Sequence, residues 1–344
     1  MCLAAWREGE RPEGCPVRIV AIGGGTGLSV LLSGLKRSDA EITAVVTVGD
    51  DGGSSGRLRQ ELGLLPPGDF RSCIAALADD ESLMSQVLQY RFGDGSLADH
   101  ALGNLLLAAL ERITGSFENA VLELGRVLSI RGSIMPSTLE SVTVCAEVVD
   151  ERASPDRVVL VRGESKVGLS GRAIRRVFLE PGSPPAFPGA VAAILRADLL
   201  VLGPGSLYTS VLPNLLVPGL RDAVLSSRAI RVYVCNVAHQ PGETGGYSIE
   251  AHAQAIEDNA GPGLFQYVLA NRTWPEQVYE SCVRPEGRPM SYALVLADLI
   301  DEQRPWRHDA AKLGSALMKF LEAVPSRPAE QRCSEQQLQG RDHI

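Results

Sequence analysis

The chain has 344 residues, of which 45% are hydrophobic, so it is long enough to bury one large core or two modest ones. Its 33 Lys and Arg residues are outnumbered by 41 Asp and Glu residues, and the formal net charge of -8 is opposite to that of a typical nucleic-acid-binding protein. We therefore expect no nucleic acid among its partners, and any anionic ligand must be bound by local donors.

The scattered cysteines and histidines exclude several other classes. The seven cysteines form no CxxC pair, a distribution typical of reduced thiols in the cytosol. The five histidines show no metal-ligand spacing, and no GxSxG elbow is present. No apolar run approaches the roughly 20 residues of a membrane-spanning helix, and the start of the chain becomes charged too early for a signal peptide. The sequence predicts a cytoplasmic protein with no membrane insertion, no disulfide and no zinc site.

The predicted elements begin after a polar segment, residues 1–16, which we expect to be a flexible tail. Residues 17–22 are an apolar run typical of a buried strand, residues 27–36 have helical periodicity, and residues 42–48 form a second apolar run rich in β-branched side chains. This order predicts a β-α-β unit. The Gly, Ser and Pro content of residues 50–69 predicts a long loop rather than packed elements.

The middle of the chain changes character twice. Helical periodicity returns after the loop and continues to about residue 129. Three short alternating segments then predict an inserted, antiparallel, β-rich subdomain at about residues 130–180. Apolar strands that alternate with helices resume from about residue 197.

These elements predict an α/β fold: a Rossmann-like, mostly parallel sheet with helices on both faces, and an inserted small antiparallel β-rich subdomain. No repeat or low-complexity linker divides the chain. We therefore expect a single domain over residues 17–324, followed by a flexible C-terminal tail at residues 325–344.

A glycine loop follows the first predicted strand directly. In open α/β sheets, ligands bind outside the carboxyl ends of the strands, and glycine leaves backbone N–H groups free to approach a phosphate at a helix N-terminus. The loop predicts a phosphate site at Gly24, Gly25, Thr26 and Gly27, with a ligand-free tight turn as the alternative. The last glycine of the full Rossmann spacing is missing, and no Walker Lys follows.

Carboxylates, hydroxyls and a guanidinium follow the second predicted strand. Asp50 and Asp51 are candidates to accept bonds from ribose hydroxyls or to hold a divalent cation such as Mg²⁺, and capping of the turn is a third interpretation. Ser54 and Ser55 are further candidate donors. Arg57 would clamp a phosphate, or would be an ordinary surface Arg.

Two later strand ends carry similar groups. Gly203, Gly205 and Ser206 offer backbone and hydroxyl donors before a helix, so this loop and the first one would together embrace one diphosphate. Further candidate ligand residues after another strand are Asn236, Glu243 and Tyr247.

Polar residues also occur at two predicted helix starts. Asp69 has the position of an N-cap, and Arg71 would face a ligand. Asn104, beside several leucines, needs partners if it is buried, and either a ligand or a loop would supply them.

Seven motifs in this order resemble the YvcK gluconeogenesis factor family, within the CofD (2-phospho-L-lactate transferase) superfamily. The resemblance extends from about residue 17 to residue 321 and is carried by IGGGTGLSVLLSGLK, VTVGDDGGSSGRLR, PPGDFRSCIAAL, GNLLLAAL, LGPGSLYTSVLPNLLVPG, CNVAHQPGETGGYS and RHD. Proteins of this family look like cytosolic binders of UDP-sugars, notably UDP-N-acetylglucosamine, that are needed for cell shape and wall precursor supply on gluconeogenic carbon sources.

The resemblance implies roles for particular residues and partners. The first glycine loop would meet the diphosphate, Asp50 and Asp51 the ribose or a cation, Gly205 and Ser206 further oxygens, and Arg307 of the RHD motif the nucleotide-sugar. It also implies a homodimer that regulates a cytosolic enzyme of wall precursor synthesis, with the UDP-sugar as ligand and no required cofactor.

Two enzyme classes are alternatives to this regulatory role. One is a CofD-like, Mg²⁺-dependent phospho-group or nucleotidyl transferase, in which Asp50 or Asp51 would hold the metal across a diphosphate. The other is an NAD(P)-binding oxidoreductase, which the first strand, the glycine turn and the distant Asp favour. The sequence identifies no catalytic residue.

Overall fold

A computed structural model of the protein describes residues 16–78, 83–149 and 157–324. The predicted C-terminal tail, and the predicted N-terminal tail apart from residue 16, lie outside these ranges. In the described ranges, every helix is too short or too polar to cross a lipid bilayer.

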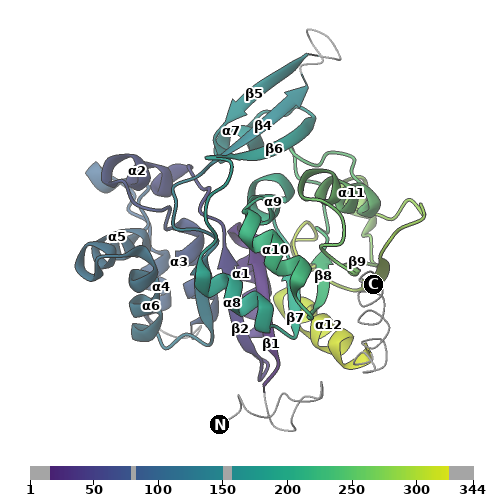
Figure 1. The fold of residues 1–344 in the computed structure, drawn as a ribbon, viewed down its shortest axis with the longest axis horizontal. Coiled ribbons are helices and arrows are strands. Elements are labelled where there is room, and N and C mark those ends of the chain that lie inside the picture. Colours follow the sequence, from purple (N-terminus) through teal and green to yellow (C-terminus); the bar gives the residue numbers. More distant parts are fainter. Residues whose placement is uncertain (1–15, 79–82, 150–156, 325–344) are drawn as a thin grey trace, which may run out of the picture.

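A seven-stranded sheet forms the centre of the molecule, and all of its strand pairs are parallel (Figure 1). The spatial order of the strands is β10-β9-β8-β7-β1-β2-β3. Their bounds are β1 (Arg18–Gly23), β2 (Glu41–Val46), β3 (Ser133–Pro136), β7 (Leu199–Leu202), β8 (Ile230–Val234), β9 (Tyr267–Asn271) and β10 (Ala293–Ala297). The predicted mostly parallel α/β sheet is confirmed.

The order of the strands creates a switch point beside β1. The chain leaves β1 toward β2 and β3 on one side, and the later strands β7 to β10 extend the sheet in the opposite direction. The crevice between the carboxyl ends of β1 and β7 is therefore the place where doubly wound sheets bind their ligands.

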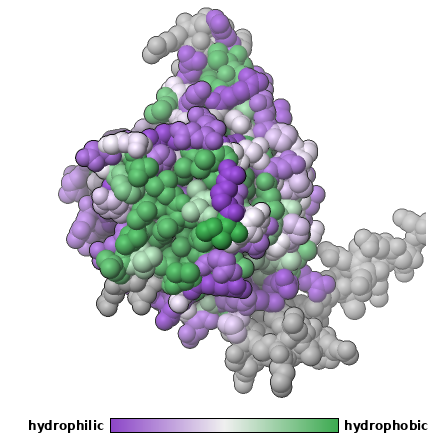
Figure 2. Space-filling model, turned by 90° about the vertical axis from the view of Figure 1, so that its left-hand side faces the viewer, coloured by the Kyte–Doolittle hydropathy of each residue, from purple (hydrophilic) through white to green (hydrophobic). Residues whose placement is uncertain are grey.

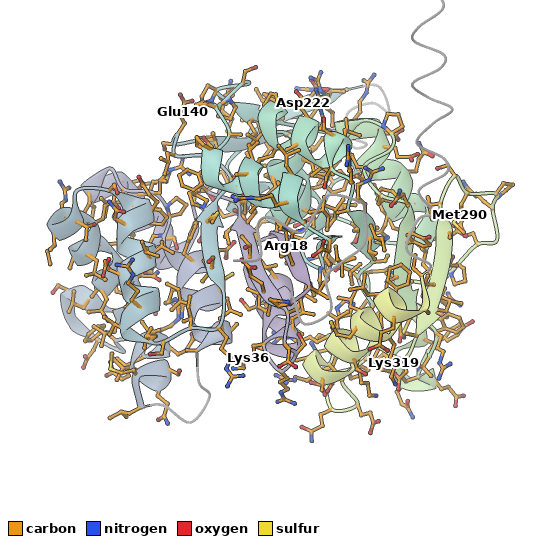
Figure 3. The ribbon with its side chains drawn as sticks, turned by 60° about the horizontal axis from the view of Figure 1, so that its bottom comes forward. Arg18, Lys36, Glu140, Asp222, Met290 and Lys319 are labelled. Carbon is orange, nitrogen blue, oxygen red and sulfur yellow. The ribbon has the colours of Figure 1, made fainter. Side chains whose placement is uncertain are left out.

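Helices cover both faces of the sheet. Helix α1 packs against α3 and α12, whereas α8 packs against α10 and β1. Figure 3 shows Asp222 of α10 and Lys319 of α12 on opposite sides of Arg18 in β1. The helix bounds are α1 (Gly25–Leu35), α2 (Gly53–Leu62), α3 (Gly68–Leu77), α4 (Leu83–Gln89), α5 (Leu102–Thr114), α6 (Phe117–Val127), α7 (Glu164–Leu169), α8 (Pro188–Arg196), α9 (Leu212–Leu215), α10 (Pro218–Ser226), α11 (Ile249–Ala260) and α12 (Ala310–Ala323), with the 3₁₀ turns η2 (Gly95–Leu97) and η4 (Glu276–Ser281) and the π-helical turn η3 (Leu207–Val211).

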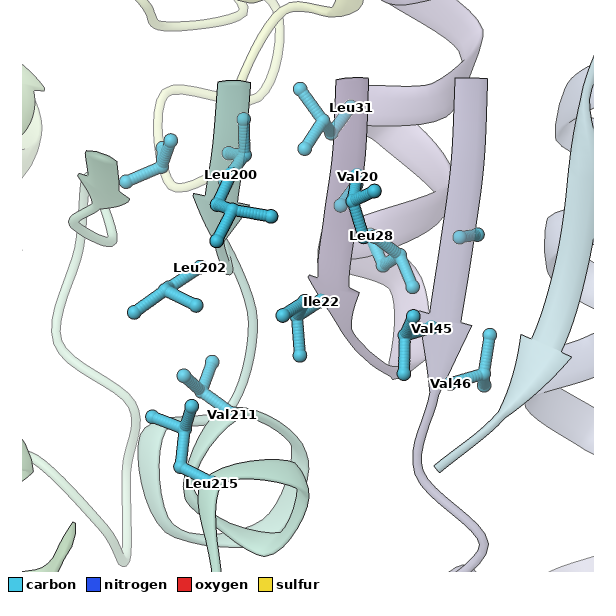
Figure 4. Packing of buried hydrophobic residues seen from close by; sticks show 14 of the residues in the cluster. Val20, Ile22, Leu28, Leu31, Val45, Val46, Leu200, Leu202, Val211 and Leu215 are labelled. Carbon is cyan, nitrogen blue, oxygen red and sulfur yellow. The ribbon is translucent and has the colours of Figure 1, made fainter. Parts of the chain in front are cut away.

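The core is built from the branched side chains of the central strands. Val20 and Ile22 of β1 lie near Leu28 and Leu31 of α1, and all four are buried (Figure 4). Burial of each such side chain contributes roughly 1.5–3 kcal/mol, which explains the nearly continuous apolar runs of these strands. The strand ends, and the loops that follow them, are thereby held in fixed positions.

The small antiparallel sheet lies over the carboxyl edge of the large one (Figure 1). Its order is β5-β4-β6, with bounds β4 (Thr143–Val149), β5 (Val158–Arg162) and β6 (Ile174–Glu180), and α7 lies between β5 and β6 in the chain. The predicted antiparallel subdomain is present, but it begins at β4 rather than near residue 130, because β3 pairs with β2 in the large sheet.

The prediction of a long loop at residues 50–69 is wrong in part, because helix α2 forms within this segment. This helix ends at Gly63 in the left-handed conformation, whose N–H donates to the carbonyl of Arg59. It also buries Ser54, Ser55 and Leu58. Packing of this one face outweighs the poor helix propensity of its Gly and Ser residues.

Candidate functional site

The loops after β1 and β7 touch each other at the switch point. A Cβ on Gly27 would collide with the carbonyl oxygen of Pro204, and a Cβ on Gly205 would lie 3.2 Å from the carbonyl oxygen of Gly24. Glycine is thus required for close approach of the two backbones. The two glycine loops therefore lie side by side, as binding of one diphosphate by both loops would require, and the diphosphate itself stays a prediction.

The first loop leads into the N-terminus of α1, which has no side-chain cap and no acidic residue in its first turn. Gly25 adopts a φ of +62°, and its N–H donates to Oδ2 of Asp69 at 2.7 Å. The following N–H groups of the first helical turn have no intrahelical acceptor, and they carry the partial positive charge of the helix. Thr26 is exposed beside them. This end of α1 is chemically suited to an anion.

Asp69 does not cap α3, contrary to the prediction. The N-cap position is Pro67, and the Asp69 carboxylate reaches across to Gly25 of the glycine loop. Burial, followed by the neighbouring charge of Asp50, raises the pKa of Asp69 to about 6. The sequence did not identify Asp69 as a site residue, because its position before an apolar helix is also that of an ordinary N-cap.

Asp50 and Asp51 each have one oxygen engaged by the backbone. Asp50 Oδ1 accepts the N–H of Gly52 at 2.9 Å, so Asp50 caps the turn, as one of its three interpretations predicted. Asp51 Oδ1 accepts the N–H of Ser165 at 2.9 Å, and so it fastens α7 of the small subdomain to the loop after β2. Binding of ribose or metal through their other oxygens stays a prediction.

Glu164 adds a further carboxylate at the start of α7. Its Oε2 is buried and accepts no hydrogen bond from the described residues. Burial is the main cause of a pKa raised well above the usual value for Glu, and Asp69, Asp50 and Asp51 raise it further. No pattern in the sequence indicated this residue, since it belongs to a different predicted subdomain.

The carboxylates fit a divalent cation in charge and donor type. In the part of the chain that the structure describes, no three acidic, His or Cys side chains form a ready-made metal cage. Mg²⁺ is usually held by only one or two carboxylates together with waters and substrate phosphates. The unpartnered oxygen of Glu164 is buried and feels the charge of Asp50, so these two residues would hold Mg²⁺ if a phosphate supplied further oxygens, and binding of the cation here stays a prediction.

Four other predicted residues are engaged inside the protein. Ser54 Oγ lies 3.0 Å from Nδ1 of His100 and accepts from Nδ2 of Asn104 at 3.0 Å. Ser55 Oγ accepts the N–H of Gly68, and Arg57 donates to a backbone carbonyl. For Asn104, the structure thus shows the internal bond that was one of its two interpretations.

The second glycine loop is held by a carboxylate and an amide. Gly203 has a φ of +75°, and the N–H of Gly205 donates to Oδ1 of Asn236 at 3.2 Å. Ser206 Oγ donates to Oε1 of Glu243 at 3.0 Å, and the N–H of Tyr208 donates to the other oxygen of that carboxylate at 3.4 Å. These hydrogen bonds bring together four of the predicted residues: Gly205, Ser206, Asn236 and Glu243.

Tyr247 and Arg307 lie farther out. The Tyr247 hydroxyl is 2.9 Å from that of Tyr208, and both rings line a cavity of about 370 Å³ behind the second loop. Arg307 is exposed on the segment whose backbone pairs with Asp301. Its side chain makes no hydrogen bond to the other candidate residues within the described ranges, and its contact with a nucleotide-sugar stays a prediction.

A cleft of about 650 Å³ opens beside Thr26 and runs along α1. Arg71 of α3 lines it and donates to Gln89 of α4 at 2.5 Å. The remaining lining combines hydroxyl and amide groups, from Ser29, Ser33, Ser72, Ser85 and Gln86, with the apolar side chains of Val30, Ala75, Ala76 and Ala310. Such a surface offers a ligand both hydrogen-bonding groups and apolar contact.

The sequence profile of the family described as 2-phospho-L-lactate transferase CofD matches residues 19–323, which is nearly all of the described chain. The chain belongs to the CofD family. Within it, the gluconeogenesis factor of Bacillus subtilis strain 168 is 43% identical, over 91% of this chain and 99% of that protein. A putative gluconeogenesis factor of a Nostoc species is 46% identical, over 88% of this chain and 68% of that protein. The resemblance to the gluconeogenesis factors is confirmed.

Solved structures of CofD relatives have the same fold. A crystal structure of a Bacillus halodurans protein superposes on this chain with a TM-score of 0.83 at 41% identity. The match covers 88% of this chain and 100% of the Bacillus halodurans chain. A second, described as a member of the UPF0052 family from the same organism, gives a TM-score of 0.81. The α/β sheet with its antiparallel insertion is thus a shared architecture.

Proposed function

We propose that this CofD-family chain is a cytosolic gluconeogenesis factor that binds a UDP-sugar, UDP-N-acetylglucosamine, and regulates an enzyme of wall precursor supply. The observation that carries the proposal is the contact of the two glycine loops at the switch point, where Gly27 meets Pro204 and Gly205 meets Gly24. A diphosphate in this crevice would accept bonds from the backbone of both loops.

The surroundings of the crevice support the sugar end of such a ligand. The cleft beside Thr26 offers hydroxyl and amide groups, and its volume of about 650 Å³ lies within the range of small-molecule sites. The cysteines Cys73, Cys145, Cys235 and Cys282 are free and buried, which suits a reducing compartment such as the cytosol. A role in cell shape would follow from control of wall precursors.

A Mg²⁺-dependent transferase is a second candidate. It is favoured by the carboxylates of Asp50, Asp69 and Glu164, because the charge of Asp50 raises the pKa of both Asp69 and Glu164. A cation between them and a diphosphate would neutralise charge during transfer of a phospho group. For the oxidoreductase alternative, Asp50 or Asp51 would bind the ribose of the dinucleotide through the carboxylate oxygen that does not accept a backbone N–H group.

Calorimetric titration of the full chain with UDP-N-acetylglucosamine, with Mg²⁺ and with a chelator, tests the proposal. The Thr26→Val variant keeps the shape of the loop and removes one hydroxyl. Because a hydrogen bond to a charged group contributes roughly 1.5–3 kcal/mol, we expect this variant to bind at least about tenfold more weakly. Ser38→Ala is the matched control. Ser38 lies in the turn before β2, at the amino ends of the strands, whereas the glycine loops lie at their carboxyl ends.

Chromatography of the titrated sample separates the candidates. Recovery of intact nucleotide-sugar supports the regulatory protein, whereas a new phosphorylated or nucleotidyl product supports the transferase. Heat of binding with NAD but none with the UDP-sugar would contradict both. Equal affinities of Thr26→Val and Ser38→Ala would show that the glycine loop is not the phosphate site.

A further inference from the structure

The cleft beside Thr26 contains a buried positive charge. Arg71 of α3 lines this cleft, and only 7% of its surface is exposed. Among the described residues that line the cleft, Arg71 is the only one with a charged side chain, and the others carry hydroxyl, amide or apolar groups. We call this space the Arg71 cleft. Its lining is therefore positive, within a protein whose net charge is -8.

The guanidinium of Arg71 has neutral partners. It donates through Nη1 to Gln89 and through Nη2 to Ser72 Oγ at 3.2 Å, and both of these residues also line the cleft. Its Nε is buried and donates to no atom in the part of the chain that the structure describes. A Cβ on Gly103 would lie 2.8 Å from Arg71 Cγ, so α5 packs directly on the stem of Arg71 and fixes the guanidinium.

The charges around Arg71 do not neutralise it. Burial is the main cause of its lowered pKa, and the second is the like charge of Arg91, which acts more strongly than the carboxylates of Asp69 and Asp50. Within the described ranges, no carboxylate forms an ion pair with Arg71. Buried charges in proteins are normally paired, because removal of an ion from water is costly. The Arg71 cleft is therefore suited to an anionic group.

A surface arginine of α6 shows the ordinary arrangement. The outer surface over α2, α4, α5 and α6 is broadly apolar (Figure 2). Arg126 of α6 is exposed and pairs with Glu123 at 2.7 Å, so its charge is balanced locally. Arg71 differs because it is buried and its hydrogen-bond partners are neutral. Arg126 thus supplies a matched control for Arg71.

The Arg71 cleft adjoins the proposed phosphate site. Thr26 lies in the first turn of α1, beside the N–H groups that would hold a diphosphate, and it also lines the cleft. A sugar joined to that diphosphate would therefore enter the cleft. The planar guanidinium matches the two oxygens of a carboxylate through parallel N–H···O bonds. Because the glycine loops would take the phosphates, the anionic group left for Arg71 belongs to the sugar.

We propose that the Arg71 cleft is a subsite for a carboxylate on the sugar, so that the protein binds nucleotide-sugars with an acidic sugar more tightly than those with a neutral one. This inference rests on the proposed function, because it needs a UDP-sugar in the crevice. The hydroxyl and amide groups of the cleft serve either kind of sugar, whereas only a carboxylate balances the buried charge. Arg71 is then the residue that determines specificity for the sugar.

Titration of the full chain with UDP-glucuronate and with UDP-glucose tests the inference, because the two ligands differ only by a carboxylate in place of a hydroxymethyl group. We expect the wild type to bind UDP-glucuronate at least about tenfold more tightly, since a hydrogen bond to a charged group is worth about that factor or more. Arg71→Gln should bind the two ligands within about twofold of each other. Arg71→Lys keeps the charge but loses the planar fork, so it should retain part of the preference. Arg126→Gln should retain all of it.

Hydrogen exchange of the wild type covers the case in which Arg71→Gln fails to fold. Peptides from α3 and α4 should be more protected with saturating UDP-glucuronate than with saturating UDP-glucose, and peptides from α10 should not differ. Equal affinities of the wild type for the two ligands, or a folded Arg71→Gln protein that keeps the preference, would overturn the inference and leave the proposed function standing. Absence of binding by both ligands would overturn the proposed function and the inference together.

Discussion

The carboxylate of Asp69 accepts the backbone N–H of Gly25 at 2.7 Å, although 44 residues separate them in the chain. This bond fastens the N-terminus of α3 to the glycine loop before α1. It also places a negative charge next to the N–H groups that would hold an anion. The site therefore contains both the donors for a phosphate and carboxylates that a proton or a cation must neutralise.

The pH dependence of stability follows from the raised pKa of Asp69. Its value of about 6 in the folded protein exceeds the usual 3.8, so the folded state binds more protons between these values. The free energy of unfolding should fall as pH rises from about 4 to about 6, by up to about 3 kcal/mol. Asp69→Asn keeps an acceptor for Gly25 and removes this dependence. Urea unfolding at pH 4.5 and pH 7 measures it, and equal pH slopes for both proteins would contradict the assignment.

The contact between the two glycine loops predicts a severe effect of one methyl group. Gly27→Ala would place a Cβ against the carbonyl of Pro204, and backbone atoms on both sides cannot move away easily. We expect a loss of about 3 kcal/mol, the upper end for overpacking. Gly245→Ala is the control, because nothing lies within 4 Å of its added Cβ. Urea unfolding should show the control within about 0.5 kcal/mol of the wild type.

The unpartnered carboxylate of Glu164 predicts opposite effects on stability and on metal use. Its pKa is raised by burial and by neighbouring carboxylates, so the charged form is costly in the free protein at neutral pH. Glu164→Gln should therefore stabilise the free protein at pH 7 by about 1 kcal/mol, the cost of one poorly paired buried group. Any gain in UDP-sugar affinity from Mg²⁺ should fall about tenfold, the lower end of the cost in metal affinity when a group that supports a metal site is removed.

Calorimetry of Glu164→Gln, with Mg²⁺ and with a chelator, measures the second effect, and thermal unfolding measures the first. Glu140→Gln is the control, since Glu140 is exposed. A variant that is less stable than the wild type but keeps the full response to Mg²⁺ would refute both assignments.

The sequence reveals the strands and the glycine loops because their signals are local. A buried parallel strand needs an apolar run, and a loop that touches another backbone at Gly27 or Gly205 needs glycine at that position. Asp69 and Glu164 were missed for the opposite reason. Their roles depend on contacts with residues far away in the chain, and a local pattern offers only capping or a surface position.

Helix α2 shows a different limit of sequence patterns. Its Gly and Ser residues predict a loop, yet Ser54 and Ser55 are buried because each is hydrogen-bonded to a distant segment. Propensity is a weak prior that tertiary contacts override. Asn104 shows the same limit, because a buried polar group needs a partner, and the sequence does not distinguish a ligand from a distant segment of the chain.

The network around Ser54 gives the last prediction. Ser54 Oγ bonds to His100 and Asn104, and all three side chains are buried. Ser54→Ala leaves both partners without this bond, so we expect a loss of about 2 kcal/mol in the free energy of unfolding. The affinity for a UDP-sugar should change less than about twofold, because the hydroxyl is engaged inside the protein.

Ser183→Ala, at an exposed turn, is the control for stability. A folded Ser54→Ala protein with normal stability but much weaker binding would show that Ser54 contacts the ligand instead.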